Sequence, residues 1–145
     1  MAGKKPHRIP ILLTALAALA LAIQVVPMAR TNPPVQADLE APAEVKAILK
    51  ASCYDCHSNE TVWPWYSRVA PMSWLVSRDV RSGRRHINFS TWNRYDAGQR
   101  RRIVGHALKL IQKGAMPPWF YVIKHPDGRM TPEKQAVLES WAATN

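Results

Sequence analysis

Apolar residues form a nearly continuous block at the start of this chain, which predicts a helix. The block covers residues 9–26 and is interrupted only by Pro10, Thr14 and Gln24. A helix rises about 1.5 Å per residue, so a segment of this length spans about 27 Å, close to the ~30 Å core of a bilayer. We therefore predict a single N-terminal transmembrane helix at residues 9–26.

Later in the chain, apolar positions recur every three or four residues, the spacing of one helix face. Such stretches occupy residues 45–56, 72–80, 103–111 and 137–142. No segment shows the strict alternation of a half-buried strand. The sequence therefore predicts an all-α fold for the part that follows the apolar block.

Local signals predict where these helices begin and end. Asp96 opens a capping-box pattern, and Gly114 is placed to end the helix that follows. Thr131 before Pro132 is typical of the start of a helix. Gly83 is expected to end the helix that starts near residue 72.

The charges on either side of the apolar block predict its orientation. Lys4, Lys5 and Arg8 precede the block, whereas Arg30 follows it closely. Because positive charge is retained in the cytoplasm, the N-terminus is expected there and the rest outside. A cleaved signal peptide is the alternative. Small residues suited to cleavage, such as Ala37, lie well beyond the apolar block, which favours an uncleaved anchor.

The predicted organisation is that of an anchored inner-membrane protein crossing the membrane once. Residues 1–8 form a basic cytoplasmic N-terminus and residues 9–26 the anchor. Residues 27–41 are expected to be a Pro-rich tether. Residues 42–145 form the functional domain, on the periplasmic side.

The most specific motif is Cys53-Tyr54-Asp55-Cys56-His57, which fits the C-x-x-C-H signature of c-type haem attachment. Side chains three and four apart share a helix face, so two thioethers can hold a porphyrin while an imidazole meets its iron. These are the only two cysteines, and a disulfide between them would close almost no loop. The motif predicts one haem c, bound covalently through Cys53 and Cys56 and ligated by His57.

Three other interpretations of the motif are open. A structural zinc site needs about four protein ligands, and two cysteines leave the remainder to scattered histidines. A thiol–disulfide oxidoreductase places C-x-x-C at the start of a helix that follows a strand, and no strand is predicted here. The third interpretation is a chance match, which the predicted export disfavours.

Met116 is the expected sixth iron ligand. It follows a predicted helix end and precedes two prolines, a rigid loop that can carry a thioether across a haem. A methionine that fills the core is the ordinary alternative. His86 and His125 are alternative sixth ligands, whereas His106 lies among basic residues at helical spacing and is expected to be solvated.

The formal net charge is +10, and arginines dominate residues 78–102. A run of charge is usually a solvated face, but it also suits a redox partner protein with an acidic surface. The predicted export excludes nucleic acid as a partner. A set of aromatic residues is expected to pack the core, and some of its members are expected to wall the haem: Trp63, Trp65, Tyr66, Trp74, Trp92 and Trp119.

Several motifs together resemble one protein family. They are Cys53–Thr61 (CYDCHSNET), Trp63–Pro71 (WPWYSRVAP), Ser73–Val76, Gly83–His86, Asn88–Ser90, Met116-Pro117 and Thr131-Pro132. The chain is similar in them to the bacterial haem-binding domain family of membrane-anchored, cytochrome c-like proteins. The resemblance implies a cytochrome c-like helical fold around one covalent haem, with Cys53 and Cys56 as attachment points and His57 as proximal ligand. Residues 119–123 depart from the Leu- and Pro-rich run of that family.

The function that these features predict is one-electron transfer at the outer face of the cytoplasmic membrane, without enzymatic turnover. One alternative is a haem-based sensor of small ligands or a peroxidase-like enzyme, in which His86 would be the first suspect for a distal acid–base residue. Another is a structural or regulatory haem module of a respiratory assembly.

Overall fold

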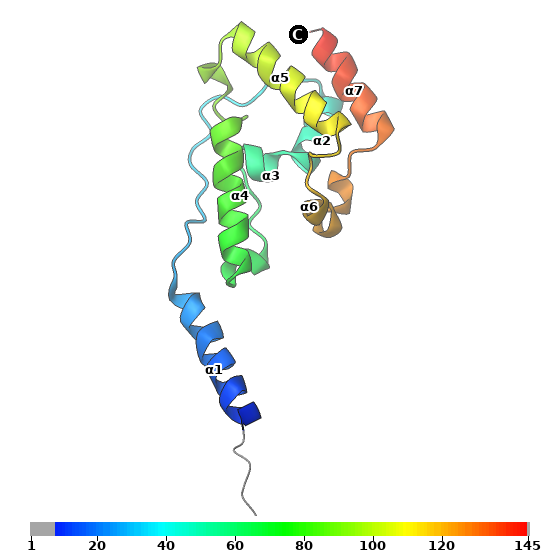
Figure 1. The fold of residues 1–145 in the computed structure, drawn as a ribbon. Coiled ribbons are helices and arrows are strands. Elements are labelled where there is room, and N and C mark those ends of the chain that lie inside the picture. Colours follow the sequence, from blue (N-terminus) through cyan, green and yellow to red (C-terminus); the bar gives the residue numbers. More distant parts are fainter. Residues whose placement is uncertain (1–7, 145) are drawn as a thin grey trace, which may run out of the picture. The chain divides into compact units, whose positions relative to one another are not determined.

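The computed structural model describes residues 8–144, which form helices and connecting segments (Figure 1). The α-helices in this range are α1 (Arg8–Ala22), α2 (Ala43–Ser52), α3 (Tyr54–His57), α4 (Met72–His86), α5 (Ala97–Gln112), α6 (Trp119–Lys124) and α7 (Pro132–Ala143). Short 3-10 helices are η1 (Ile23–Val25), η2 (Trp65–Arg68), η3 (Trp92–Arg94) and η4 (Pro126–Gly128). Within the described range, the only β-type pairing is an isolated bridge between Ala37 and Thr91.

The predicted membrane anchor is wrong. The α-helix α1 has 15 residues, which is about 22 Å at 1.5 Å per residue and short of the ~30 Å bilayer core. It passes into the 3-10 turn η1, and Val26 is extended. Between residues 8 and 144, no helix has the length and apolar character needed to cross a membrane. The single-pass inner-membrane location, with its periplasmic side for residues 42–145, is therefore not supported. Of the basic segment 1–8, residues 1–7 lie outside the described part.

The chain divides into two compact units. The first contains the residues up to Arg30 together with Pro64–Arg78. Side chains link its two segments: Gln24 exchanges hydrogen bonds with the backbone of Ala70, and Arg30 donates to the Ser67 carbonyl. The second unit contains Thr31–Trp63 and the chain from Asp79 onward, and it holds the residues of the C-x-x-C-H motif.

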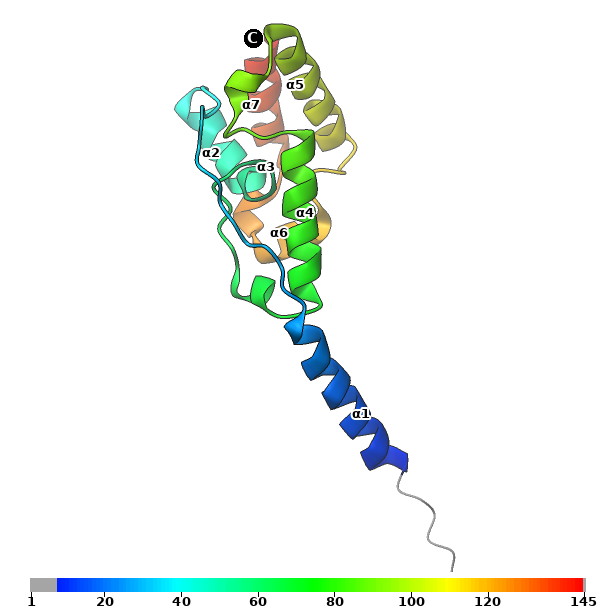
Figure 2. The same cartoon turned by 90° about the vertical axis from the view of Figure 1, so that its left-hand side faces the viewer.

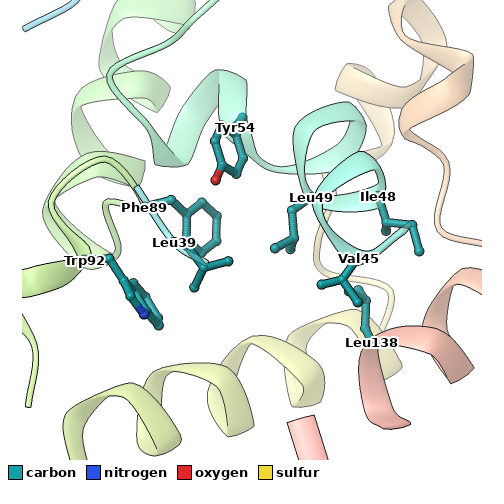
Figure 3. Close-up of a cluster of buried hydrophobic side chains, with 8 residues drawn as sticks. All are labelled: Leu39, Val45, Ile48, Leu49, Tyr54, Phe89, Trp92 and Leu138. Atoms are coloured by element: carbon teal, nitrogen blue, oxygen red, sulfur yellow. The ribbon is translucent and has the colours of Figure 1, made fainter. Parts of the chain in front are cut away.

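The core of the second unit is a cluster of buried apolar side chains (Figure 3). Its members are Leu39, Val45, Ile48, Leu49, Tyr54, Phe89, Trp92 and Leu138. Helical spacing puts Val45, Ile48 and Leu49 on one face of α2, where they meet Leu138 of α7. Tyr54 stacks on Phe89 with ring centroids 5.2 Å apart, which carries the cluster to the C-x-x-C-H motif.

Helices α5 and α7 lie side by side, and α7 also contacts α2 (Figures 1 and 2). The predicted capping box is confirmed: Asp96 accepts from the Gln99 amide, and the Gln99 side chain accepts from the Asp96 amide. The predicted start of α7 is also confirmed, because Thr131 accepts from the Lys134 amide next to Pro132.

Residues 31–41, which include most of the expected tether, belong to the second unit. The backbone amides of Gln36 and Leu39 donate to the carbonyls of Ser90 and Phe89, and the Leu39 side chain is 1% exposed. This segment therefore contributes to the core.

Three elements differ from the sequence prediction. Helix α4 continues past Gly83 to His86, and Gly83 packs against the backbone of Cys56 instead of ending the helix. The helix expected over 45–56 breaks at Cys53, where φ is −132°. Helix α6 was not predicted, since its six residues are too few to show helical periodicity.

Candidate functional site

The break at Cys53 shapes the backbone of the C-x-x-C-H motif. The Cys53 amide still donates to the Leu49 carbonyl of α2, at 2.8 Å. The Cys53 carbonyl then accepts from the amides of Cys56 and His57, at 3.2 and 2.9 Å. Cys53 thus closes α2 and opens the single turn α3. The structure places Cys53, Cys56 and His57 on that one turn.

Helix α4 approaches this turn at Gly83, as the adjacent ribbons in Figures 1 and 2 show. A Cβ on Gly83 would lie 2.3 Å from the Cys56 carbonyl oxygen and 3.1 Å from the Cys56 Cβ. Only glycine fits this approach without a shift of backbone. A glycine is therefore required at position 83 because α4 packs closely on the motif there, and not because a helix ends there.

The same approach orients the imidazole of His57. Its Nδ1 lies 3.0 Å from the Gly83 carbonyl oxygen and 3.3 Å from that of Ile87. An Nδ1–H donor suits these two acceptors, which leaves the lone pair on Nε2. Burial lowers the pKa of His57 below its ordinary value of 6.5, against a smaller opposing effect of the two carbonyls. The ring is neutral at pH 7 and free to ligate a metal through Nε2.

Polar side chains fix the loop that follows His57. Arg84 donates to the Ser58 carbonyl, the Thr31 carbonyl, the Asn32 side chain and the Thr61 hydroxyl, at 2.7 to 3.0 Å. Burial lowers the pKa of Arg84, but four acceptors satisfy its guanidinium. Arg84, in the Gly83–His86 motif, is thus bonded to the end of the Cys53–Thr61 motif.

A second group of bonds joins the same loop to residues 88–90. Asn88 donates to the Asn59 side chain at 2.9 Å, and the Asn59 amide donates to the Ser90 hydroxyl at 2.9 Å. The Phe89 amide donates to the His57 carbonyl at 2.8 Å. The carbonyl of His57 is therefore held by a segment distant in sequence, whereas its amide is held locally by the Cys53 carbonyl.

Helix α6 contacts the motif through Tyr121. Its hydroxyl lies 2.9 Å from Asp55 Oδ2 and 3.1 Å from the Ala51 carbonyl oxygen, and shares its proton between them. The ring of His125 stacks on that of Tyr121, with centroids 4.3 Å apart and planes at 10°. Burial and the Asp55 carboxylate raise the pKa of Tyr121, so it stays a neutral donor.

The two thiols are uncharged at neutral pH. Burial, with a smaller contribution from the neighbouring thiol, raises the pKa of Cys53 to about 12. Burial and the nearby acids Asp55 and Asp79 raise the pKa of Cys56 to about 11. Thiolates are the reactive species in disulfide exchange and the ligands of zinc, so both alternatives are disfavoured here. Among residues 8–144 no group of three or more His, Cys, Asp or Glu is arranged to hold a metal ion.

Met116 lines a cavity of about 410 Å³ in the second unit, and no residue of the motif is part of the lining. The cavity wall includes Trp119, Ile123 and Met130. Met116 is 37% exposed and Trp119 is 74% exposed, so this wall presents apolar surface that the described chain leaves uncovered.

The histidines considered as sixth ligands have different surroundings. His86 is exposed, and its Nδ1 lies 2.8 Å from the Ser82 carbonyl oxygen. It belongs to the end of α4 that faces the Nδ1 edge of His57, opposite to Nε2. His125 is half-buried against Tyr121, and His106 is exposed on α5 as expected.

Reasoning from the sequence missed three supporting residues: Gly83 as a contact, Arg84 as the centre of the loop bonds and Tyr121 as the link to α6. Arg84 and Gly83 fall inside the resembling motif 83–86, which was the available signal. No sequence signal identified Tyr121, because its contact with Asp55 joins residues 66 positions apart.

The arrangement suits a covalently bound porphyrin. Thioethers are uncharged, so a setting that disfavours thiolates accepts them. His57 offers a neutral imidazole whose other nitrogen is already bonded. The close approach of Gly83 to Cys56 packs helix α4 directly against the turn that carries Cys56 and His57. The residues present therefore fit a haem held by Cys53, Cys56 and His57.

Comparison with known proteins gives one family. Residues 18–144 match the family model described as haem-binding domain. No curated protein and no solved structure matches the chain.

Proposed function

The chain belongs to the haem-binding domain family, and from this premise we propose that it is a c-type haem protein that transfers single electrons. It binds haem as a member of that family. The proposal adds covalent attachment through Cys53 and Cys56, His57 as proximal ligand and Met116 as sixth ligand.

The observation that carries the proposal is the environment of His57. Its Nδ1 is engaged by the Gly83 and Ile87 carbonyls, one turn from two thiols that burial keeps protonated. A fixed tautomer and ring orientation are what an axial histidine needs. Addition of the Cys53 and Cys56 thiols across vinyl groups would form thioethers and move each thiol proton to carbon, so the buried site would gain no charge.

Met116 is supported as sixth ligand by its chemistry and by its surroundings. A thioether binds haem iron and raises the reduction potential relative to a second imidazole. Met116 has uncovered apolar neighbours in Trp119 and Ile123, which are suitable to cover the face of a porphyrin. His86 is less suitable, because it lies on the Nδ1 side of His57.

Electron transfer is the activity that these residues favour. Bound haem supplies a one-electron iron couple. The chain would supply two strong-field ligands, His57 and Met116, and one-electron transfer through them requires no substrate pocket. A peroxidase needs a distal acid–base group, whereas His86, the residue suspected for that role, is exposed with its Nδ1 against the Ser82 carbonyl of its own helix.

The proposed partner is a redox protein with an acidic surface. Helix α5 carries Arg100, Arg101, Arg102 and Lys109 and no acidic residue, and Lys113 follows as its C-cap. Arg102, His106, Lys109 and Lys113 are exposed and recur at helical spacing, so they form a basic stripe. Such a stripe steers an acidic partner, with an association rate that falls as salt rises.

The test is the absorption spectrum of the purified haem protein in its ferric and ferrous states, with and without carbon monoxide. Electron transfer predicts low-spin, six-coordinate spectra, no carbon monoxide complex and a reversible one-electron titration. Ready binding of carbon monoxide by the ferrous protein would contradict the proposal and favour a sensor or a peroxidase-like enzyme.

A further inference from the structure

Helix α6 and the 3-10 helix η4 pack on the segment that carries the C-x-x-C-H motif (Figure 1). The two elements contact each other, and η4 also contacts α2, the helix that leads into the motif. They follow Met116 closely along the chain, because α6 begins at Trp119. The contacts that hold α6 and η4 therefore also bear on the position of the Met116 loop.

A tyrosine hydroxyl bonds α6 to the motif. The Tyr121 oxygen lies 2.9 Å from Asp55 Oδ2 and 3.1 Å from the Ala51 carbonyl oxygen. Asp55 is itself fixed on its other side, because its Oδ1 accepts from the Val62 amide at 2.9 Å. Its carbonyl oxygen accepts from the Thr61 hydroxyl at 2.7 Å. Tyr121 is thus bonded to an acceptor that the motif holds in place.

Packing confines the ring of Tyr121 as well. The His125 ring stacks on it, with centroids 4.3 Å apart and planes at 10°. Gly128 of η4 lies so close that a Cβ there would be 2.9 Å from Tyr121 Cε1 and 2.7 Å from the Ala51 carbonyl oxygen. A glycine is therefore needed at position 128 for η4 to reach both Tyr121 and the end of α2.

The Met116 loop is held at both of its ends. On the α5 side, the amides of Ala115 and Met116 donate to the Leu110 carbonyl, at 2.9 and 3.3 Å. On the α6 side, two prolines restrict the backbone after Met116, and the Tyr121 amide donates to the Pro118 carbonyl at 3.0 Å. Only five positions separate Met116 from Tyr121, so a shift of the tyrosine is passed on to the methionine.

We propose that Tyr121 is a positioning residue for the sixth iron ligand, an inference that rests on the proposed ligation by His57 and Met116. Its hydroxyl ties the segment that follows Met116 to the turn that carries His57. The two ligands come from distant parts of the sequence, so a contact that fixes one segment against the other sets how well the thioether competes for the iron. Residues that support a metal ligand in this way commonly change metal affinity about 10- to 100-fold.

The test is a titration of the full-length, ferric haem-loaded protein with imidazole, for wild type and for Tyr121→Phe. The substitution keeps the ring that packs on His125 and Gly128, and it removes only the hydroxyl. A less well positioned Met116 competes less strongly with an added ligand, so imidazole should bind about tenfold more tightly to the variant. The near-infrared thioether band should weaken in the same protein before imidazole is added.

Tyr95→Phe is the matched control. The Tyr95 hydroxyl accepts from the Asn88 amide at 3.1 Å in the same unit, so this variant also loses a buried tyrosine contact. Urea unfolding reports the cost of each substitution to the fold. Tyr95→Phe should change imidazole affinity less than about twofold, even at a similar loss of stability. A purely structural role of Tyr121 would move stability alone.

A second variant tests the bond from its other partner. Asp55→Ala removes the acceptor and should also tighten imidazole binding, which decides the question if Tyr121→Phe protein does not fold. Because both substitutions break one bond, the double variant should bind imidazole no more than about twofold more tightly than Asp55→Ala alone.

Unchanged imidazole affinity in folded Tyr121→Phe protein, equal gains in the Tyr95→Phe control, or additive effects in the double variant would overturn the positioning role. A wild-type ferric spectrum without the thioether band would contradict Met116 as ligand, and so the proposed ligation itself. The failure of this inference and the failure of the proposed function are therefore distinguished by the wild-type spectrum.

Discussion

At the scale of single residues, the site is built by side chains and one glycine that support the C-x-x-C-H motif without belonging to it. Gly83 lets α4 reach the Cys56 carbonyl, and the carbonyls of Gly83 and Ile87 orient His57. The motif supplies the reactive groups, and these contacts decide which nitrogen and which protonation state each group presents.

Replacement of Gly83 tests that support. In Gly83→Ala protein the new Cβ would meet the Cys56 carbonyl oxygen at 2.3 Å, so backbone must shift. We expect a loss of about 1–3 kcal/mol in the free energy of unfolding, measured by denaturant titration, and reduced haem retention. Gly105→Ala is the matched control, because its Cβ has open space and should stabilise by about 0.5–1 kcal/mol. Equal stability of the two variants would refute the role of Gly83.

Replacement of Met116 tests the sixth ligand. Met116→Ala should lower the reduction potential, or open the iron to carbon monoxide, because a thioether stabilises ferrous iron. Met130→Leu is the control, since Met130 lines the same cavity and is not the proposed ligand. Redox titration and the near-infrared ferric spectrum provide the measurement. If Met116→Ala changes neither and His125→Ala changes both, the haem is ligated by two histidines.

The Asp38 carboxylate predicts how the stability of the fold falls at acid pH. Burial alone would raise its pKa, but bonds to Lys46, Tyr54 and the Leu39 amide together hold it below the ordinary value of 3.8. A lowered folded pKa means that the stabilisation is complete well above pH 3.8 and is lost as pH falls through the folded pKa. Asp38→Asn should therefore destabilise at pH 6 and differ little from wild type near pH 2. Urea midpoints across this range give the measurement, and a difference independent of pH would contradict it.

At the scale of helices, the sequence predicted what local chemistry decides. The capping box at Asp96 and the start of α7 at Thr131 depend on residues within three positions, and both are present. The end of α4 was predicted wrongly because Gly83 is required by its close contact with Cys56, which is 27 positions away. The length of α1 was misjudged because the apolar run from residue 9 to 26 continues beyond the end of its α-helix at Ala22.

In the candidate site, too, some residues could be predicted from local sequence patterns and others could not. Cys53, Cys56 and His57 are recognisable from their spacing alone, and the structure places them on one turn. The bonds of Arg84 and Tyr121 join residues 23 to 70 positions apart, and no local sequence pattern predicts them. Residues that react were therefore predictable, whereas residues that orient them were not.

Removal of the Asp96 cap tests how much the capping box stabilises helix α5. Asp96→Ala loses the side-chain acceptor for the Gln99 amide and should reduce the free energy of unfolding by about 0.5–2 kcal/mol. Asp127→Ala is a suitable control, because Asp127 is an exposed acid that caps no α-helix. Thermal and urea unfolding provide the measurement. Equal effects of the two substitutions would show that the cap contributes nothing specific.

At the scale of the whole molecule, the second unit has little fully buried apolar surface for its size. Neither α5 nor α6 contains a fully buried residue, and Trp119, Phe120 and Ile123 of α6 are exposed. Small domains with limited cores commonly depend on a covalent or metal staple. A haem attached at Cys53 and Cys56 would both bury such surface and restrain the chain.

Covalent attachment of the haem underlies the proposed function, and acid–acetone extraction distinguishes covalently bound haem from haem that is released. The full-length protein is matured by a c-type haem assembly system, denatured and extracted, and haem is measured in both phases. Haem should stay with the polypeptide, and Cys53→Ala/Cys56→Ala protein should release any haem that it binds. Release of all haem from the wild-type chain into the acetone phase would show that the attachment is not covalent.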